Sequence, residues 1–206
     1  MGTILYYAHD PMCSWCWGFR PAWRSLCAQL PPEIRVARLL GGLAPDTDEP
    51  MPAEMRRHLQ QTWRRIEQRI PGTCFNFEFW ERCQPRRSTY PACRALIAAR
   101  HQGEQHEESM LLAIQQAYYQ QARNPSEEST LLELAREIGL DSAAFSVELN
   151  SESTRQQLLR EIATTRSLGL YSFPALALDT GGSRWPVAVD YTAPRAMLEQ
   201  IRGLLE

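Results

Sequence analysis

A short apolar segment at residues 3–8 passes directly into a helical pattern, and two cysteines spaced three apart stand at the junction, in Cys13-Ser14-Trp15-Cys16. A strand that turns into a helix here places the first sulfur at the helix N-terminus, where unpaired backbone N–H groups and the helix dipole favour a thiolate. Cys13 is therefore the predicted nucleophile. Because Cys16 lies one helical turn later, it is the predicted resolving thiol, which attacks a mixed disulfide formed at Cys13.

The composition excludes several other classes of function. All 22 basic residues are arginines, so no mechanism that needs a lysine amine is available. A net charge of −2 gives no electrostatic reason to expect nucleic acid or an anionic membrane as a partner. The first apolar stretch is too short for a secretion signal or a membrane span. We expect a cytoplasmic protein whose six cysteines are mostly reduced.

The apolar pattern predicts a strand-helix-strand unit at the beginning of the chain. Apolar residues recur every three or four positions from Phe19 to Leu30, and Pro31 ends this helix. Residues 34–40 then read as a second strand, which Gly41-Gly42 closes.

From Ala44 onward a loop rich in proline and aspartate leads into a long helical region. Strand character returns at residues 175–178 and 184–189, which predict a hairpin, and a final helix has Thr192 as its expected N-cap. The predicted class is therefore α/β. The helices expected in the central region cover residues 55–70, 91–102, 110–118, 131–138, 142–149 and 152–168.

This order of elements, with Cys-x-x-Cys opening the first helix and Phe173-Pro174 preceding the third strand, resembles the thioredoxin superfamily and its DsbA-like branch, which carries a helical insertion. The resemblance implies a thioredoxin-like domain built from residues 1–44 and 170–206, and a helical insertion domain at 45–169 that covers the cysteines. Four segments are similar to the cytoplasmic FrnE-type subgroup of predicted protein disulfide isomerases: residues 10–19, 41–43, 91–95 and 172–175.

The resemblance also implies a function and a set of contacts. The expected activity is that of a thiol–disulfide oxidoreductase or protein disulfide isomerase on protein thiols and disulfides. No bound cofactor or metal is expected, and glutathione is a candidate redox partner. Pro174 is the implied cis-proline facing the cysteines, although a trans proline at a strand start is the alternative from the residues alone. The residues expected to contact substrate are Ser14, Trp15, Phe173 and Pro174.

One position departs from the thioredoxin pattern. Many relatives carry a buried carboxylate six residues before the first cysteine, as a proton acceptor for the resolving thiol, and this chain has Tyr7 there. Asp10 is the nearest acid in sequence. A carboxylate close to Cys13 would oppose the effect of the helix terminus on the thiolate.

Three alternatives remain for the cysteine pair. A zinc site needs a second ligand pair, and the remaining cysteines lack zinc-finger spacing. A glutathione-dependent isomerase or kappa-type glutathione transferase would share the fold, but these relatives typically have serine in place of the first cysteine. A zinc-stabilised or peptide-binding module is the non-enzymatic hypothesis.

The other conspicuous side chains have structural interpretations. Cys27 and Cys93 lie on apolar helix faces and are expected to be buried, and whether Cys74 and Cys83 form a disulfide is left open. The aromatic run at residues 75–80 either packs in the core or lines a groove for unfolded polypeptide. The arginines of residues 56–69 are interpreted as a solvated helix face.

Overall fold

The strand-helix-strand unit predicted at the start of the chain is present in the computed structural model, which describes residues 2–205. It consists of β1 (Ile4–His9), α1 (Ser14–Cys27) and β2 (Arg35–Leu40). The two strands are parallel, with Ile4 opposite Arg35 and His9 opposite Leu40. Parallel neighbours need a crossover connection, and α1 supplies it.

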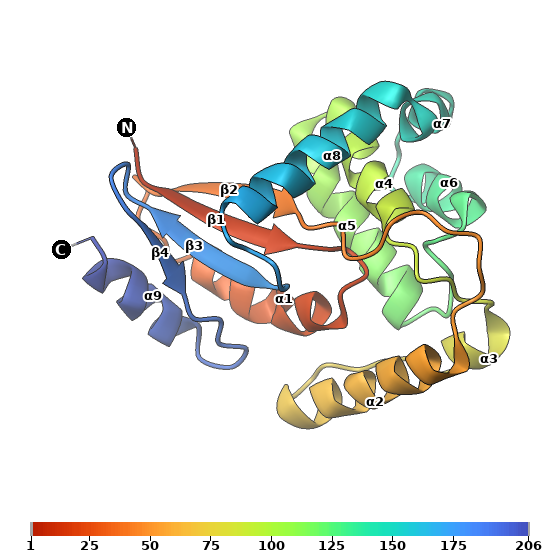
Figure 1. Cartoon of the computed structure of the whole chain (residues 1–206), viewed down its shortest axis with the longest axis horizontal. Helices are drawn as coiled ribbons and strands as arrows, with labels where there is room; N and C mark the ends of the chain where they lie inside the picture. Colours follow the sequence, from red (N-terminus) through yellow and green to blue (C-terminus); the bar gives the residue numbers. More distant parts are fainter. Residues whose placement is uncertain (1, 206) are drawn as a thin grey trace.

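The predicted hairpin is also confirmed. β3 (Ala175–Asp179) pairs antiparallel with β1, and β4 (Arg184–Val187) pairs antiparallel with β3. The resulting sheet has the order β2-β1-β3-β4, so segments far apart in the sequence meet at its centre (Figure 1). The carboxyl end of β1 and the start of β3 therefore come together beside the N-terminus of α1.

The two faces of the sheet are covered by different helices, because side chains alternate along each strand. Leu5 and Tyr7 point to the face packed by α1 and α9 (Pro194–Gly203). Ala8 points to the opposite face, where it packs with Ala177 of β3 and with Leu170, which follows α8 (Glu152–Ser167). Figure 1 shows α1 and α9 on one side of the sheet and α8 crossing the other.

The segment between β2 and β3 is helical, as predicted, and forms a second hydrophobic core around α4 (Tyr90–His101). α4 is buried along most of its length, and its small residues, Ala92, Ala95 and Ala98, let neighbouring helices approach closely. The other helices of this region are α2 (Ala53–Arg69), α3 (Phe79–Arg82), α5 (Glu104–Tyr119), α6 (Glu128–Glu137) and α7 (Ser142–Asn150).

The local details differ from the sequence prediction at two points. The short helix α3 falls in the aromatic run and was not predicted, since four residues carry too little periodicity. The predicted N-cap of the last helix is wrong, because Ala193 occupies that position and no side chain caps it. The Asp190 carboxylate instead accepts from the backbone N–H groups of Thr192 and Ala193, at 2.8 and 2.7 Å.

Candidate active site

Cys13 and Cys16 stand at the start of α1, where the sheet meets the helical region. Cys13 is the N-cap residue with an extended backbone, and its carbonyl accepts the first helical hydrogen bond from Trp17 at 3.1 Å. Both sulfurs are free thiols. Cys13 is 6% exposed and Cys16 is 1% exposed, so the first cysteine is the more accessible one.

The loop before β3 faces Cys13. The Cys13 thiol donates to the carbonyl oxygen of Phe173 at 3.3 Å, and the peptide bond between Phe173 and Pro174 is cis, as the family resemblance implies. The Phe173 ring is half-buried against Gly41, the first residue after β2. A Cβ atom at Gly41 would stand only 2.0 Å from the ring. The backbone of Phe173 therefore faces the cysteine, while its side chain holds the loop against β2.

The surroundings of Cys16 keep its thiol protonated in the free protein. Burial raises the pKa of Cys16 well above its usual value, and the side-chain hydrogen bond to Cys13 raises it further. Tyr7 occupies the position of the carboxylate found in many relatives. Its pKa is also raised, first by burial and then by the nearby Cys16 and Cys13. The residue in this position is therefore a neutral phenol beside Cys16, with no charge of its own.

Asp10 is fully buried, and its carboxylate accepts hydrogen bonds from groups other than Cys13. It accepts from the backbone N–H groups of Met12 and Leu43, at 2.8 and 2.7 Å, and from the Thr89 hydroxyl at 2.7 Å. The Cys93 thiol adds a longer contact of 3.6 Å. Burial raises the pKa of Asp10 and these donors oppose the rise. The carboxylate therefore ties the end of β1 to the loop after β2 and to α4.

Ser14, which the resemblance implies contacts substrate, packs against α2 in the structure, and its contact with substrate stays a prediction. Its side chain is buried, and its hydroxyl accepts from the Trp63 indole N–H of α2 at 2.9 Å. A second contact joins the same two helices, since a Cβ at Gly18 would stand 2.7 Å from the Ile70 side chain. These contacts place α2 directly beside the cysteine motif.

Trp15 is the residue of the motif that reaches the surface. It is partly exposed, and its ring lies 5.3 Å from the ring of Tyr191, in the loop before α9. The Arg69 guanidinium at the end of α2 lies 5.8 Å from both ring centres. The predicted position of Trp15 at the surface near the cysteines is therefore matched by the structure, and sequence reasoning missed Arg69 and Tyr191.

The remaining cysteines are separate from the motif. Cys93 is fully buried as predicted, whereas Cys27 is only half-buried and packs at the margin of the core. Cys74 and Cys83 are free thiols. Cys83 donates to the Ala122 carbonyl at 3.1 Å, so its thiol has a partner other than Cys74.

Most rings of the aromatic run pack in the core, although Phe75 also lines a surface hollow of about 370 Å³. The rings of the run surround the fully buried Trp63, with Phe75 stacked at 4.9 Å and Trp80 tilted at 4.8 Å between ring centres. Phe79 is also fully buried. Phe77 is the member that stays partly exposed, beneath the Arg64 guanidinium.

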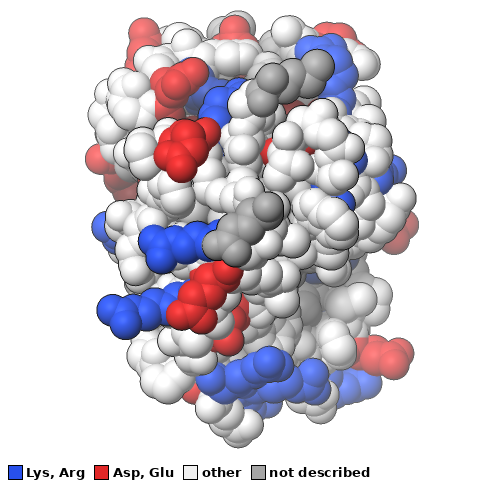
Figure 2. Space-filling model, turned by 90° about the vertical axis from the view of Figure 1, so that its left-hand side faces the viewer, with Lys and Arg blue, Asp and Glu red and all other residues white. Residues whose placement is uncertain are grey.

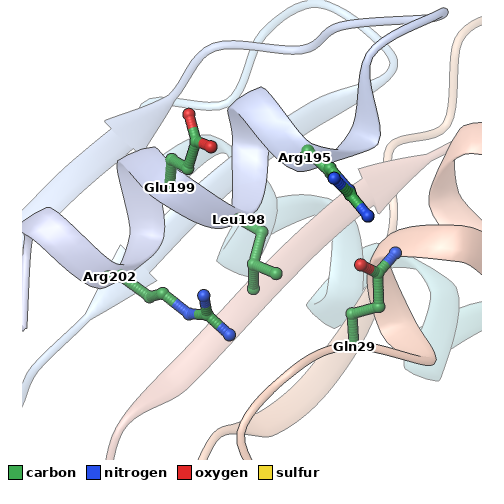
Figure 3. A pocket seen from close by; sticks show the side chains of 5 residues that line it. All are labelled: Gln29, Arg195, Leu198, Glu199 and Arg202. Carbon is green, nitrogen blue, oxygen red and sulfur yellow. The ribbon is translucent and has the colours of Figure 1, made fainter.

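The surface has a further hollow of about 430 Å³, between α9 and the residues that follow α1 (Figure 3). Arg195, Arg202 and Gln29 line it, with Leu198 at its base. Helix α1 separates this hollow from Cys13, and its 14 residues span about 21 Å. This hollow is therefore not part of the cysteine site.

Within residues 2–205, no group of three His, Cys, Asp or Glu side chains is arranged to hold a metal ion. In the same range, no helix has the length and apolar character that crossing a bilayer requires. Arginines and acidic side chains lie interspersed over the face shown in Figure 2.

The model of the thioredoxin family matches residues 6–181, which include the cysteine motif, the cis-proline loop and all of the helical region. The chain belongs to the thioredoxin family. Within it, solved structures of the DsbA-like branch share the whole architecture, so this thioredoxin-family chain has the fold of thiol–disulfide oxidoreductases.

Two solved structures are especially similar. A candidate protein disulfide isomerase from Nitrosomonas europaea has 26% identity and a TM-score of 0.85, over 100% of this chain and 98% of that one. The cytosolic disulfide reductase DsbM from Pseudomonas aeruginosa has 26% identity and a TM-score of 0.77, over 98% and 99%. DsbM has also been solved with GSH.

The curated relatives are longer proteins. The ClpXP adapter protein SpxH of Bacillus subtilis is 25% identical over 97% of this chain and 67% of its own length. SpxH of Halalkalibacterium halodurans is 25% identical, and the match covers 82% of this chain and 56% of that protein.

Proposed function

We propose that this protein is a thiol–disulfide exchange enzyme that reduces and isomerises disulfides of protein substrates, with Cys13 as nucleophile and Cys16 as resolving thiol. The observation that carries the proposal is the placement of the Cys13 sulfur at the first turn of α1, against the backbone of Phe173 before the cis-proline. Such a position combines a sulfur near unpaired helical N–H groups with an adjacent extended segment that pairs with a substrate chain.

In the proposed reaction the Cys13 thiolate attacks one sulfur of a substrate disulfide. A mixed disulfide forms, and the other substrate sulfur leaves as a thiolate that takes a proton from solvent. Cys16 then loses its proton and attacks the Cys13 sulfur, which releases the second substrate thiol and leaves a Cys13–Cys16 disulfide. The substrate has gained two electrons. When the released substrate thiolate attacks the mixed disulfide first, the result is isomerisation.

We propose glutathione as the source of electrons that returns the cysteine pair to its thiol form. Two glutathione molecules supply the two electrons and leave as oxidised glutathione. The proposal is supported by DsbM, a relative described as a cytosolic disulfide reductase and solved with GSH. The same relative supports a cytoplasmic setting for this chain.

Turnover of a disulfide-linked fluorescent peptide, with glutathione as reductant, tests the proposed roles. Cys13→Ser is expected to abolish turnover. With glutathione left out, Cys16→Ser is expected to accumulate a mixed disulfide between Cys13 and the peptide, detectable by mass spectrometry. Cys74→Ser, which changes an exposed cysteine outside the site, is the matched control and is expected to keep full activity. Undiminished turnover by Cys13→Ser would exclude the proposal.

A further inference from the structure

Arg69 is a cation beside the cysteine motif with no partner for its charge. Its side chain is exposed at the end of α2, and within residues 2–205 it forms no ion pair and donates no hydrogen bond. Two aromatic rings lie beside it, those of Trp15 and Tyr191, and each ring centre is 5.8 Å from the guanidinium carbon. The two rings fix the position of the guanidinium and leave its N–H groups available.

The guanidinium borders a pocket of about 180 Å³, which is also lined by residues of the loop before α9: Val189, Asp190, Tyr191 and Thr192. Asp190 places a negative charge in the same pocket. Its Oδ1 atom accepts from the backbone of Thr192 and Ala193, and these bonds, with a smaller contribution from Arg69, lower its pKa. The pocket therefore presents one fixed cation and one fixed anion.

The pocket adjoins the cysteine motif through Tyr191. The Tyr191 ring forms its wall and packs on Trp15, which lies between the two cysteines in the sequence. Burial raises the pKa of Tyr191, and the nearby Cys13 and Cys16 raise it further. A ligand linked through sulfur to Cys13 has this pocket within reach, since a tripeptide extends about 10 Å.

We infer that Arg69 and Asp190 form a binding subsite for the charged ends of glutathione, with Arg69 bound to a carboxylate and Asp190 to the α-amino group. The opposite charges and the small volume match a zwitterionic peptide better than a folded protein surface. This inference rests on the proposed function, because it names the residues that select the thiol at Cys13.

The subsite gives the protein a preferred reaction with mixed disulfides between glutathione and a protein. The Cys13 thiolate attacks the glutathione sulfur, the protein thiolate leaves and is protonated, and glutathione remains joined to Cys13. A second glutathione thiolate then attacks the bound glutathione sulfur, which releases oxidised glutathione and restores the Cys13 thiolate. Two molecules of glutathione in total thus leave as one disulfide.

The decisive experiment compares two substrates that differ in the group linked to the same peptide cysteine. One carries glutathione, and the other carries β-mercaptoethanol, which has neither a carboxylate nor an amine. For Arg69→Gln, we expect kcat/KM for the glutathione-linked peptide to fall about tenfold, which corresponds to about one lost charge-assisted hydrogen bond. Turnover of the β-mercaptoethanol-linked peptide is expected to stay within twofold. Asp190→Asn is expected to show the same selectivity.

The matched control is Arg64→Gln, on the same helix. Arg64 is also exposed and lies over an aromatic ring, Phe77, at 5.1 Å, but it does not line the pocket. We expect this variant to match the unmodified protein with both substrates. Equal loss on both substrates in Arg69→Gln, or no loss on either, would overturn the inference.

A binding measurement separates this inference from the proposed function. S-methylglutathione carries the charged ends of glutathione and cannot exchange disulfides. Titration calorimetry is expected to give a Kd about tenfold weaker for Arg69→Gln than for the unmodified protein. If the unmodified protein turns over disulfides but the Kd for S-methylglutathione is the same in Arg69→Gln, the subsite is refuted and the proposed function is not. Binding that depends on Arg69 in a protein with no turnover would refute the function and support the subsite.

Discussion

Gly41→Ala tests whether the contact between the end of β2 and the cis-proline loop positions the site. The added Cβ would stand 2.0, 2.2 and 2.5 Å from three atoms of the Phe173 ring, where ordinary contact begins at 3.4 Å. The ring must therefore retreat by about 1.4 Å. Gly41 has no positive φ, so alanine adds this clash without backbone strain at its own position.

The retreat has two consequences. Overpacking of this kind costs about 1–3 kcal/mol, which lowers the melting temperature by about 2–4 °C for each kcal/mol in a chain of this size. The Phe173 carbonyl also moves away from Cys13, and the 3.3 Å contact between them does not survive a shift of this magnitude. We expect kcat/KM for a peptide disulfide to fall at least tenfold, because the backbone that pairs with the substrate is displaced.

Three measurements check this reasoning. Thermal unfolding reports the stability, peptide disulfide turnover reports the site, and alkylation of Cys13 by iodoacetamide reports whether the sulfur itself stays accessible and reactive. Alkylation is expected to remain within about twofold. The double variant Gly41→Ala with Phe173→Ala removes the clashing ring and should recover part of the lost stability. If Gly41→Ala alone shows unchanged turnover and melting temperature, the ring does not hold the loop as described.

Three further predictions concern buried polar groups. His9 is buried with both ring nitrogens lacking a partner, and burial lowers its pKa to about 3, so the unfolded chain binds its proton first as pH falls below about 6.5. In His9→Phe the new ring can still stack on Tyr7, but it binds no proton. When the pH is lowered from 6.5 to 5, the free energy of unfolding measured with urea should therefore fall by about 2 kcal/mol less in this variant than in the unmodified protein. Identical pH profiles for the two proteins would contradict this. Asp10→Asn should lower the free energy of unfolding at pH 7 by about 2 kcal/mol, since an amide replaces an acceptor of several buried donors; unchanged urea midpoints would show that the carboxylate is not the tie described. Ser14→Ala should cost about 1–3 kcal/mol by leaving the Trp63 N–H unpaired, measured as a lower midpoint of urea unfolding, and a neutral result would mean that this bond does not hold α2 to α1.

The local sequence determined the elements and the placement of the cysteine pair. Alternation along residues 34–40 and the three-to-four spacing from Phe19 onward predicted β2 and α1 correctly, because these periods follow from backbone geometry alone. The motif at Cys13-Ser14-Trp15-Cys16 lies at the start of α1 for the same local reason. The short α3 escaped prediction because one turn carries no period. The last helix begins after Ala193, and the Asp190 carboxylate, in place of the Thr192 side chain, accepts from backbone N–H groups just before the helix, those of Thr192 and Ala193.

Only the tertiary structure decided what surrounds the sulfurs. The Phe173 carbonyl reaches Cys13 across 160 positions of sequence, and Trp63 binds Ser14 across 49, so no local pattern records either contact. The same holds for Arg69, which the sequence presents as one of several arginines on a solvated helix face. Packing of α2 against Gly18 brings its last turn over Trp15 and separates this arginine from the others. Side-chain periodicity is a property of neighbouring residues, whereas a binding site depends on which distant elements pack together.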